Sequence, residues 1–489
     1  MKPSSLQLTR TTIMNRKGTH PHCGPGGESV DLDIPENWSL ANPARGRYRT
    51  MKHLLKRLLS SPVFIVGFAF ALRMVVMSVL WRQAAIPIKA NPPFGFELGR
   101  VARAIAAGEG FSSPLHGMDT GPTAWFTPIY PYLVAGIFKL WGIYSDMSRV
   151  IIATLNCAFA ALTIVPIYGI AKRSFGEGVA LGASWVWVFL PTALYFPIVW
   201  IWDTALTALF FMLIFWATLA LRGTRTIRPW AGYGALWVVG GLINPSILSL
   251  FPFFLGWLVW NERKQAGPWV KHAAAALLLF TIGLAPWTIR NYRVFGKFIV
   301  LRSNFGLELW LGNNPNVVDG TSQLSHPDDN PEEAEKYRRM GEIAYMAEKE
   351  HEAFTFMRTH PSDTLNYTFH RFVNIWLAQT GNLVDMWSSA SFYGKALMTF
   401  DCLLSLLSLL GVLYARRSSH PDAAPYAMVL LIFPLVFYLT HSSPRYRFPM
   451  DPIIVILATS SLARLISFAK FGAARKTNGA VPLPPFPAG

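Results

Sequence analysis

The chain has 489 residues, of which 52% are hydrophobic, 14% aromatic and 15% charged, and its formal net charge is +17. Soluble domains carry roughly 25% charged residues, so this composition excludes an ordinary soluble protein and favours a polytopic helical membrane protein. In a soluble chain such a positive charge would indicate a nucleic-acid partner, but no basic nucleic-acid motif is present. Membrane proteins instead concentrate basic residues in cytoplasmic loops. We therefore expect the bilayer as a partner and no nucleic acid.

The first 50 residues are polar and lack hydrophobic periodicity, which predicts a disordered tail over 1–50. The stretch MKHLLKRLLSSPVFIVGF begins at Met51 with a charged head, which makes Met51 a candidate initiator. The apolar run that follows, Pro62 to Trp81, is too long for a cleaved signal and is expected to be a retained anchor. A second disordered tail is expected over 471–489, which ends in a Pro-rich stretch.

Apolar runs of about 20 residues, the length that crosses a bilayer, recur along the chain. We expect about ten transmembrane helices, grouped in 51–290 and 392–470. The nine after the first fall at about 148–171, 178–196, 200–221, 230–246, 248–261, 270–289, 394–415, 424–440 and 449–469. Every loop that this topology assigns to the cytoplasm contains basic residues, such as Arg222, Arg263 and Arg416. The pattern predicts a multi-pass protein of the inner (plasma) membrane with both termini cytoplasmic.

Two long segments then lie outside the cytoplasm. The first external loop, 83–147, contains a helical stripe of apolar residues after Gly95 and an apolar piece from Pro131 to Trp141 that is too short to cross. We expect both to be interfacial helices. The second segment, 291–391, alternates charges at helical spacing, which predicts a small helical extracytoplasmic subdomain.

Carboxylates are scarce on the predicted outer face outside the large loop, which singles out Glu97 and Asp203. Glu97 begins the amphipathic helix, where it either answers the helix dipole or serves as a base or metal ligand at the membrane surface. Asp203 lies near the outer end of a span, either within reach of interfacial water or in a functional role. His116 and Asp119 are further metal-ligand candidates, although their setting in a Gly/Pro loop fits solvated residues better.

Basic residues gather at two predicted outer boundaries, against the positive-inside trend. One group holds Arg290, Arg293 and Lys297, and the other holds His441, Arg445 and Arg447. Guanidinium groups either grip a lipid phosphate bidentately or snorkel to the interface beside aromatic side chains. With the outer carboxylates, the two groups suit a reaction on a phosphate-bearing lipid, in which a base activates an acceptor and cations neutralise the departing phosphate.

Several stretches, taken in order and spacing, resemble bacterial membrane glycosyltransferases of the GT-C fold. This group includes dolichyl-phosphate-mannose protein mannosyltransferases and lipid A aminoarabinose transferases. The stretches are ELGRVARAIAAGEGFSSP from Glu97, GPTAWFTPIYPYL, NPSILSLFPF, PWTIRNYRVFGKF, GLELWLGNNP and SSPRYRFPMDPIIVILA. The resemblance extends from about Met51 to Lys470.

The resemblance implies a sugar donor attached to a polyprenyl phosphate and used outside the cytoplasm. It also implies inversion at the anomeric carbon without a covalent enzyme intermediate. The catalytic acid of the family, usually Asp, lies in the first external loop, and Glu97 is the matching position here. Donor-phosphate roles are implied for Arg290 and for the arginines of Arg445–Tyr446–Arg447. Asn244 stands where relatives often have Arg, so no role is carried onto it.

The expected function is therefore transfer of a sugar from a polyprenyl-phosphate donor to an external protein, lipid or glycan, with Glu97 as base or metal ligand. One alternative is a transporter or flippase of a lipid-linked intermediate, and another is a structural subunit without activity. Transport would place charged residues near mid-membrane. The predicted spans contain few, chiefly Arg73 and Asp203, and Arg73 has no role assigned from sequence.

Overall fold

A computed structural model describes residues 56–82, 94–265, 267–318, 325–377, 383–418 and 420–478. Within these ranges every element is a helix, apart from one isolated β-bridge between Ser112 and Pro122. The prediction of an all-helical membrane protein is confirmed. Residues 57–489 form one compact unit, and the account below concerns that unit. The predicted N-terminal tail, Met51 and residues 479–489 lie outside the described residues.

Apolar helices build a bundle. They are α2 (Pro62–Arg82), α5 (Asp146–Leu162), α6 (Ile164–Phe175), α7 (Glu177–Phe189), α8 (Pro191–Val199), α9 (Thr204–Leu221), α10 (Ile227–Ile243), the 3-10 helix η1 (Pro245–Leu250), α11 (Phe251–Lys264), α12 (Trp269–Phe295), α18 (Phe392–Arg417), α19 (Ala423–Ile432), α20 (Leu435–Leu439) and α22 (Asp451–Asn478). The last helix continues to Asn478, past the span predicted at about 449–469 and into the segment 471–489, where a disordered tail was expected.

Six stretches of the described chain are long and apolar enough to cross a membrane, or seven if the bent pair α7–α8 counts as one span. Helices α5 and α6 together make one of the six. The predicted number, about ten, is larger because it includes α10, α11 and α19, which are only 17, 14 and 10 residues long. Pro245 and Pro434 stand just after α10 and α19, and proline does not continue a helix.

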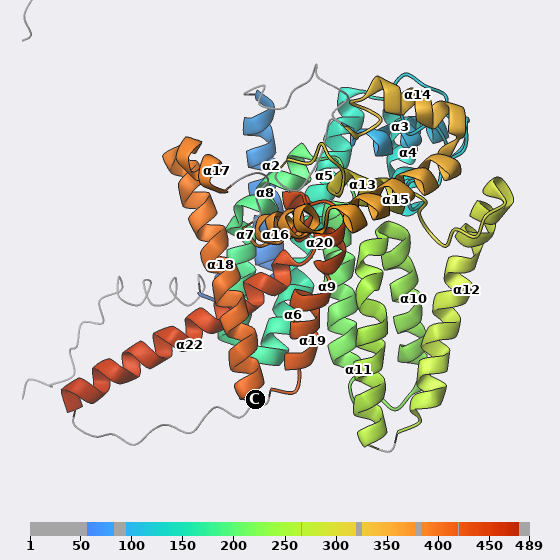
Figure 1. The fold of residues 1–489 in the computed structure, drawn as a ribbon. Helices are drawn as coiled ribbons and strands as arrows, with labels where there is room; N and C mark the ends of the chain where they lie inside the picture. Colours follow the sequence, from blue (N-terminus) through green and yellow to red (C-terminus); the bar gives the residue numbers. More distant parts are fainter. Residues whose placement is uncertain are drawn as a thin grey trace, which may run out of the picture. The chain divides into compact units, whose positions relative to one another are not determined.

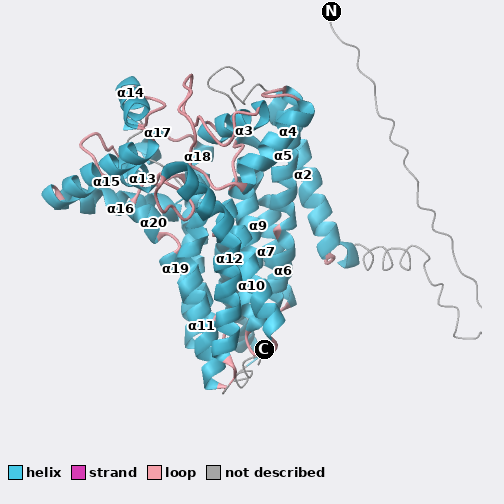
Figure 2. Cartoon of the chain, turned by 90° about the vertical axis from the view of Figure 1, so that its right-hand side faces the viewer, coloured by secondary structure: helices cyan, strands magenta, loops and turns pink. Residues whose placement is uncertain are grey.

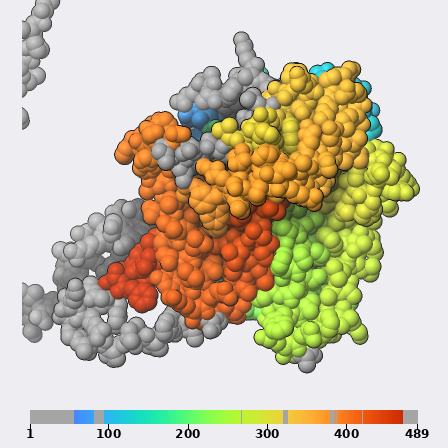
Figure 3. All heavy atoms as spheres, in the orientation of Figure 1, coloured from blue at the N-terminus to red at the C-terminus, as the bar shows by residue number. Residues whose placement is uncertain are grey.

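The other helices come from the two predicted external segments and the last loop. They are α3 (Glu97–Ala107), α4 (Ile129–Trp141), α13 (Phe305–Gly312), α14 (Pro331–Met340), α15 (Glu342–Thr359), α16 (Pro361–Leu377), α17 (Leu383–Ser389) and α21 (Pro444–Arg447). Figures 1 and 2 place α3, α4 and α13–α15 at one end of the bundle, whereas the turn between α11 and α12 lies at the opposite end. In Figure 3 the yellow and orange atoms of this region spread over that end of the bundle.

The helices at this end share a core of their own. A cluster of buried apolar side chains joins α3, α4, α13 and α15 through residues such as Val101, Tyr130 and Tyr345. A buried carboxylate adds polar ties, because Glu342 accepts hydrogen bonds from the Ala124 amide (2.7 Å) and the Ser303 hydroxyl (2.6 Å). These contacts fix the first external loop to the segment after α12.

Arg73 is fully buried in α2, and the structure explains its presence there. Pro191 and Pro197 lack an amide N–H, so within α7–α8 the carbonyls four residues earlier lose their usual helical donors. Those carbonyls belong to Trp187 and Ala193, and Arg73 donates to both, at 3.4 and 3.0 Å. The Arg73 guanidinium therefore supplies the hydrogen bonds that these two carbonyls lack within α7 and α8. Its role is structural and does not indicate a transport path.

The loops predicted to be cytoplasmic come together. Asp422, in the turn before α19, lies 2.7 Å from Arg222 after α9 and 4.0 Å from Arg173 near the end of α6. Figure 1 shows the turn between α18 and α19 at the end of the bundle away from α3. The helices thus alternate in direction as the charge pattern predicted, while the cytoplasmic assignment of this end remains a prediction.

Candidate active site

A cavity of about 1210 Å³ lies where the outer helices meet the bundle. Its walls come from the start of α3, the connection from α8 to α9, the segment 298–308, the loop before α14 and the connection from α20 to α21. Tryptophan and phenylalanine side chains supply much of the apolar lining. The charged and imidazole side chains are Glu97, Asp203, Arg302, Glu308, His326, Asp328, Asp329, Glu350, His441 and Arg445. A cavity with an aromatic lining and converging polar groups is typical of a binding site.

A tight loop brings Glu97 to this cavity. Gly95 has a φ of +81°, and a Cβ built there would lie 2.2 Å from the carbonyl oxygen of Ile201. Glycine is therefore required both by the backbone conformation and by the close approach. Helix α3 begins two residues later and buries Leu98 and Val101 in the outer core. Asp203 follows Ile201 by two residues, and Glu97 follows Gly95 by two. The contact between Gly95 and Ile201 therefore places the Glu97 and Asp203 carboxylates in the same cavity.

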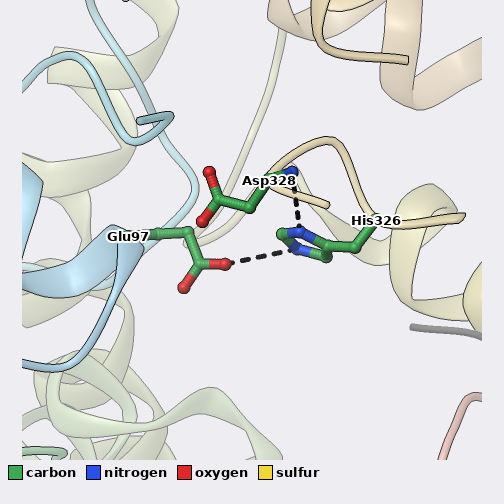
Figure 4. Close-up of side chains that lie close together, drawn as sticks. All are labelled: Glu97, His326 and Asp328. Carbon is green, nitrogen blue, oxygen red and sulfur yellow. Dashed lines mark hydrogen bonds and ion pairs between the residues drawn. The ribbon is translucent and has the colours of Figure 1, made fainter. Parts of the chain in front are cut away.

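Glu97 faces a histidine that sequence analysis did not single out. The Nε2 atom of His326 lies 3.3 Å from Glu97 Oε1, and both side chains point toward each other in Figure 4. The backbone amide of Asp328 donates to His326 Nδ1 at 3.1 Å, so the proton of a neutral imidazole lies on Nε2, facing the glutamate. Burial raises the pKa of Glu97, and the charge of Asp328 raises it further, against the opposing effect of His326 and Arg100.

Glu97, His326 and Asp328 each offer a ligand atom, and these atoms lie within 4.8 Å of one another. As arranged, however, the three do not fit a metal ion. Asp328 already accepts from Arg100 and from the His116 amide (3.1 Å). A metal at His326 Nε2 would move the imidazole proton to Nδ1, which accepts the Asp328 amide. Of the predicted metal candidates His116 and Asp119, both side chains are exposed and neither lines the cavity.

Asp203 lines the same cavity just before α9. Its Oδ2 accepts a hydrogen bond from Asn244 Nδ2 at 2.9 Å, which gives Asn244 a role that the sequence did not. Its Oδ1 is buried and has no hydrogen-bond partner among the described residues. Burial raises the pKa of Asp203, although Arg302, Asn244 and Arg445 act in the opposite direction. A buried carboxylate oxygen without a donor is a place for a ligand hydroxyl or ammonium group.

Arg445 is the cation of the cavity that sequence analysis did select. Its guanidinium carbon lies 4.1 Å from the centre of the Trp202 ring and 5.2 Å from that of Tyr446. It forms no ion pair within the described parts of the chain, although its charge acts on both Glu97 and Asp203. Arg445 also hydrogen-bonds Tyr446, and a guanidinium group with five N–H donors has others left for an incoming phosphate.

A second glutamate–histidine pair lies in another part of the cavity. Glu308 Oε2 is 3.1 Å from His441 Nδ1, Asn304 donates to Oε1 at 2.6 Å, and Arg302 lies 3.8 Å from the same oxygen. Burial would raise the pKa of Glu308, but the charges of His441 and Arg302 outweigh it and hold the pKa at about 2. This carboxylate is therefore ionised across the physiological pH range.

The remaining predicted phosphate ligands lie elsewhere. Arg447 is buried and bound to Asp451 (2.7 Å), with Asp401 at 3.7 Å and the Trp376 carbonyl as a further acceptor (2.7 Å). Arg290 donates to the carbonyls of Thr123 (2.7 Å) and Phe111 (3.1 Å) and does not line the cavity. Arg293 and Lys297 are exposed at the end of α12. Of the predicted phosphate ligands, the structure therefore brings only Arg445 close to the carboxylates of the cavity.

Comparison with known proteins gives two kinds of match. Residues 125–288, about a third of the chain, match the family model described as "Dolichyl-phosphate-mannose-protein mannosyltransferase". The archaeal oligosaccharyltransferase AglB from Archaeoglobus fulgidus, solved with an inhibitory peptide and a dolichol-phosphate, superposes with a TM-score of 0.51 at 13% identity. The chain shares the AglB fold. The match covers 86% of this chain and 52% of AglB, so the chain spans about half the length of that enzyme.

ArnT from Cupriavidus metallidurans, solved with undecaprenyl phosphate, is also similar, with a TM-score of 0.35, 13% identity, and coverage of 87% of this chain and 82% of ArnT. No curated protein sequence matches the chain. The residues matched by the family model include part of the bundle and the part of the cavity wall that runs from Trp125 to Ser246.

Proposed function

We propose that this protein is a membrane glycosyltransferase of the GT-C fold that moves a sugar from a polyprenyl-phosphate carrier to an extracytoplasmic acceptor, with inversion. One observation carries the proposal: a single cavity of about 1210 Å³ contains Glu97, Asp203 and Arg445, which come from distant parts of the sequence. The family match over 125–288 and the fold shared with AglB support the same class.

The geometry suits the chemistry of such a transfer. An acceptor hydroxyl or amide loses its proton to Glu97 as its heteroatom attacks the anomeric carbon. The bond from that carbon to the phosphate oxygen breaks on the opposite face, and its electron pair stays on the phosphate. Arg445 offsets the second negative charge that develops there. Asp203, with its unpartnered Oδ1, holds a hydroxyl of the sugar or the acceptor group.

The raised pKa of Glu97 fits the role of a base better than that of a helix-dipole partner, because a raised pKa strengthens the carboxylate as a proton acceptor. The aromatic rings of Trp125, Trp200 and Trp202 provide apolar surface for the ring faces of a sugar and the first isoprene units. The charge pattern of the loops supports an extracytoplasmic cavity in an inner (plasma) membrane protein, with both termini cytoplasmic.

The transport alternative draws no support from the buried charges. Arg73 is held by backbone carbonyls, and Arg447 is held by Asp401 and Asp451. Each of these groups therefore has a structural partner and does not line the cavity.

The test compares envelope glycolipids, glycans and glycoproteins by mass spectrometry in cells with the protein, without it, and with Glu97→Gln. A product that disappears both in the deletion and in the Glu97→Gln strain, with the variant present at normal level in the membrane, supports the proposal. A product that persists with Glu97→Gln removes Glu97 from the mechanism. An identical set of products in all strains, including the deletion, counts against a transferase altogether.

A further inference from the structure

We propose that a groove between α9 and α10 binds an anionic phospholipid of the surrounding bilayer. One acyl chain lies in the groove, and the phosphate lies between Arg225 and Arg228 in the loop that joins the two helices. The inference goes beyond sugar transfer and does not rest on it, because the groove and the cavity of the candidate active site lie at opposite ends of the same helices. Thr204, in the cavity wall, and Ala217, in the groove, are separated along α9 by about 20 Å at 1.5 Å per residue.

The end of α9 and the start of α10 line a space of about 310 Å³. Helix α9 contributes Ala217, Ala220 and Leu221. Helix α10 contributes Gly232 and Leu236, so each wall is one helix face with three- or four-residue spacing. Because alanine and glycine are small, the two helices leave this space unfilled. Its lining is chiefly carbon, which suits a hydrocarbon chain better than a polar ligand.

The groove is open along one side and has the length that an acyl chain needs. Ala220, Pro229 and Gly232 are exposed, whereas Leu221 is buried. From Pro229 to Leu236 the groove follows α10 for about 10 Å. One leaflet contributes about 15 Å of hydrocarbon, so the groove extends over roughly two thirds of a leaflet. Because α9 is long and apolar enough to cross a membrane, the open side of the groove faces lipid chains.

Two arginines without a partner lie at the mouth of the groove. Thr224 and Pro229 both line the groove, and they flank the loop segment that contains Arg225 and Arg228. Both arginine side chains are exposed, and neither has an ion pair or a side-chain hydrogen bond within the described parts of the chain. Arg222, just before this loop, is different because it pairs with the aspartate before α19 at 2.7 Å.

Three acids in the loops at this end of the bundle already have partners. Glu177 pairs with Lys172 at 2.7 Å. Glu262 pairs with His272, and Asp422 pairs with the arginine just after α9. A lipid phosphate therefore supplies the negative charge that the two loop arginines lack, and guanidinium groups bind phosphate oxygens through paired N–H donors. Basic pockets between membrane helices on the cytoplasmic side bind anionic head groups, and the charge pattern assigns this end to the cytoplasm.

The charge of the site selects among phospholipids. Phosphatidylcholine carries an ammonium group that offsets its phosphate, whereas phosphatidylglycerol has a net negative charge. Two arginines without a counter-charge favour the second kind. The bound lipid contacts both α9 and α10 and so joins the ends of two helices whose other ends carry Asp203 and Asn244.

The experiment measures, by native mass spectrometry, the dissociation constant of the first lipid that binds to the delipidated full-length protein in detergent. The lipids are dioleoylphosphatidylglycerol, dioleoylphosphatidylcholine and undecaprenyl phosphate. Each is titrated against wild type, two variants and their matched controls. Size-exclusion profiles check that every variant is folded.

The first variant addresses the groove. Gly232→Leu places a side chain in it, and a Cβ built at this position meets no atom within 4 Å. The matched control is Gly256→Leu, at an exposed position of α11 where a Cβ also meets no atom within 4 Å. Leucine favours a helix more than glycine does, so both proteins should fold.

The second variant addresses the head group. It combines Arg225→Gln with Arg228→Gln, which removes two charges from an exposed loop. Its matched control combines Arg416→Gln with Arg417→Gln, because these arginines are exposed at the end of α18, at the same end of the bundle. Neither change alters a buried side chain, so this comparison tests the proposal even if Gly232→Leu fails to fold.

We expect wild type to bind phosphatidylglycerol more tightly than phosphatidylcholine. The variant with both loop arginines replaced should lose this preference and bind phosphatidylglycerol about 25-fold more weakly, a factor of about five for each arginine. Gly232→Leu should weaken binding of both phospholipids about tenfold, because the leucine displaces roughly two methylene groups of the chain. Both controls should bind like wild type, and undecaprenyl phosphate should bind all five proteins alike.

The proposal is wrong if Gly232→Leu binds both phospholipids as Gly256→Leu does, because the groove then holds no acyl chain. It is also wrong if the two double-arginine variants bind phosphatidylglycerol equally, because the head group then lies elsewhere. Weaker binding of undecaprenyl phosphate to Gly232→Leu and to the loop-arginine variant would mean that the groove holds a carrier lipid instead. None of these results bears on sugar transfer, which is tested by the products of the Glu97→Gln strain.

Discussion

The cavity contains two glutamate–histidine pairs, and their surroundings give them opposite properties. Burial raises the pKa of Glu97, and the neighbouring acid Asp328 raises it further. Beside Glu308 lies Arg302, and with His441 it holds the pKa of Glu308 at about 2. The same two residue types therefore provide a carboxylate that can take a proton and one that stays charged. Environments that push two pKa values apart are how one site assigns acid–base and electrostatic roles.

The histidines differ as well. A backbone amide donates to Nδ1 of His326, so that its Nε2 proton faces Glu97. At His441 the carboxylate faces Nδ1, and Nε2 faces Tyr446 instead. In the proposed reaction the first pair lies at the acceptor end, and the second keeps a fixed negative charge in another part of the cavity. Substituting one residue of each glutamate–histidine pair separately therefore tests whether the two pairs have different roles.

The largest effect is expected from Glu97→Gln. Removal of a general base costs about 10²–10⁴-fold in rate, and the amide keeps the size of the side chain. The measurement is the initial rate of sugar transfer from a polyprenyl-phosphate donor in proteoliposomes. Glu109→Gln is the matched control, because Glu109 follows the same helix but pairs with Arg103 at the surface (2.7 Å). Equal rates for the two variants would refute the role of Glu97 as base.

The second-largest effect is expected in the pH dependence of kcat/KM. Glu97 acts as a base only when ionised, so kcat/KM should fall roughly tenfold for each pH unit below its pKa. Because that pKa is raised, the fall should begin above the ordinary value of 4.5. Glu308 stays ionised and should add no second step in this range.

His326→Gln sharpens the same measurement. His326 lowers the pKa of Glu97, so its removal should move the fall in kcat/KM to higher pH. A profile that stays in place would show that the histidine does not act on the base, and a profile without any acid limb in wild type would count against Glu97 itself.

Glu308→Gln should have a smaller effect of a different kind. The variant keeps the volume and removes the negative charge that positions Arg302 and His441 in the cavity wall, so the donor should bind about tenfold more weakly. We expect KM for the lipid donor to rise while the acid limb of kcat/KM stays at its wild-type pH. Steady-state kinetics at several pH values separate the two quantities. A shift of the acid limb in this variant would mean that the two pairs are not independent.

Metal removal should have the smallest effect. The Asp328 amide already donates to His326 Nδ1, and Arg100 already pairs with the Asp328 carboxylate. Treatment with EDTA should therefore leave the transfer rate unchanged, with added Mg²⁺ or Mn²⁺ as the control. Loss of the rate on chelation and its recovery with metal would overturn the conclusion that the three side chains do not fit an ion.

Local patterns in the sequence were enough to find part of this site. Glu97 stood out because acids are scarce on the predicted outer face, and Arg445 because it is basic at an outer boundary. His326 and Asp328 did not stand out, since they lie in a polar segment with many charges. Their significance comes from contacts across more than two hundred residues, with Glu97 and Arg100, which no periodicity reveals.

Other residues illustrate where the sequence misleads. Arg447 was grouped with Arg445 by proximity, yet Asp451 follows it by four residues, the spacing of an ion pair within a helical stretch. The predicted count of about ten exceeds the six or seven stretches that are long and apolar enough to cross, because it includes the shorter helices α10, α11 and α19. The amphipathic stripe after Gly95 indicated a helix, and the structure has one over Glu97–Ala107. Sequence periodicity does not predict the contact between Gly95 and Ile201, which orients this helix.

The hydrogen bonds of Arg73 bear on how the protein is made. Its carbonyl partners, Trp187 and Ala193, follow it by 114 and 120 residues. During synthesis helix α2 therefore leaves the ribosome with an arginine that has one acceptor in its own helix, the Ala69 carbonyl, while its other two acceptors do not yet exist. Stable release of that helix into lipid should wait until α7 and α8 have been inserted, and chains that stop after α6 should stay with the insertion machinery or be degraded.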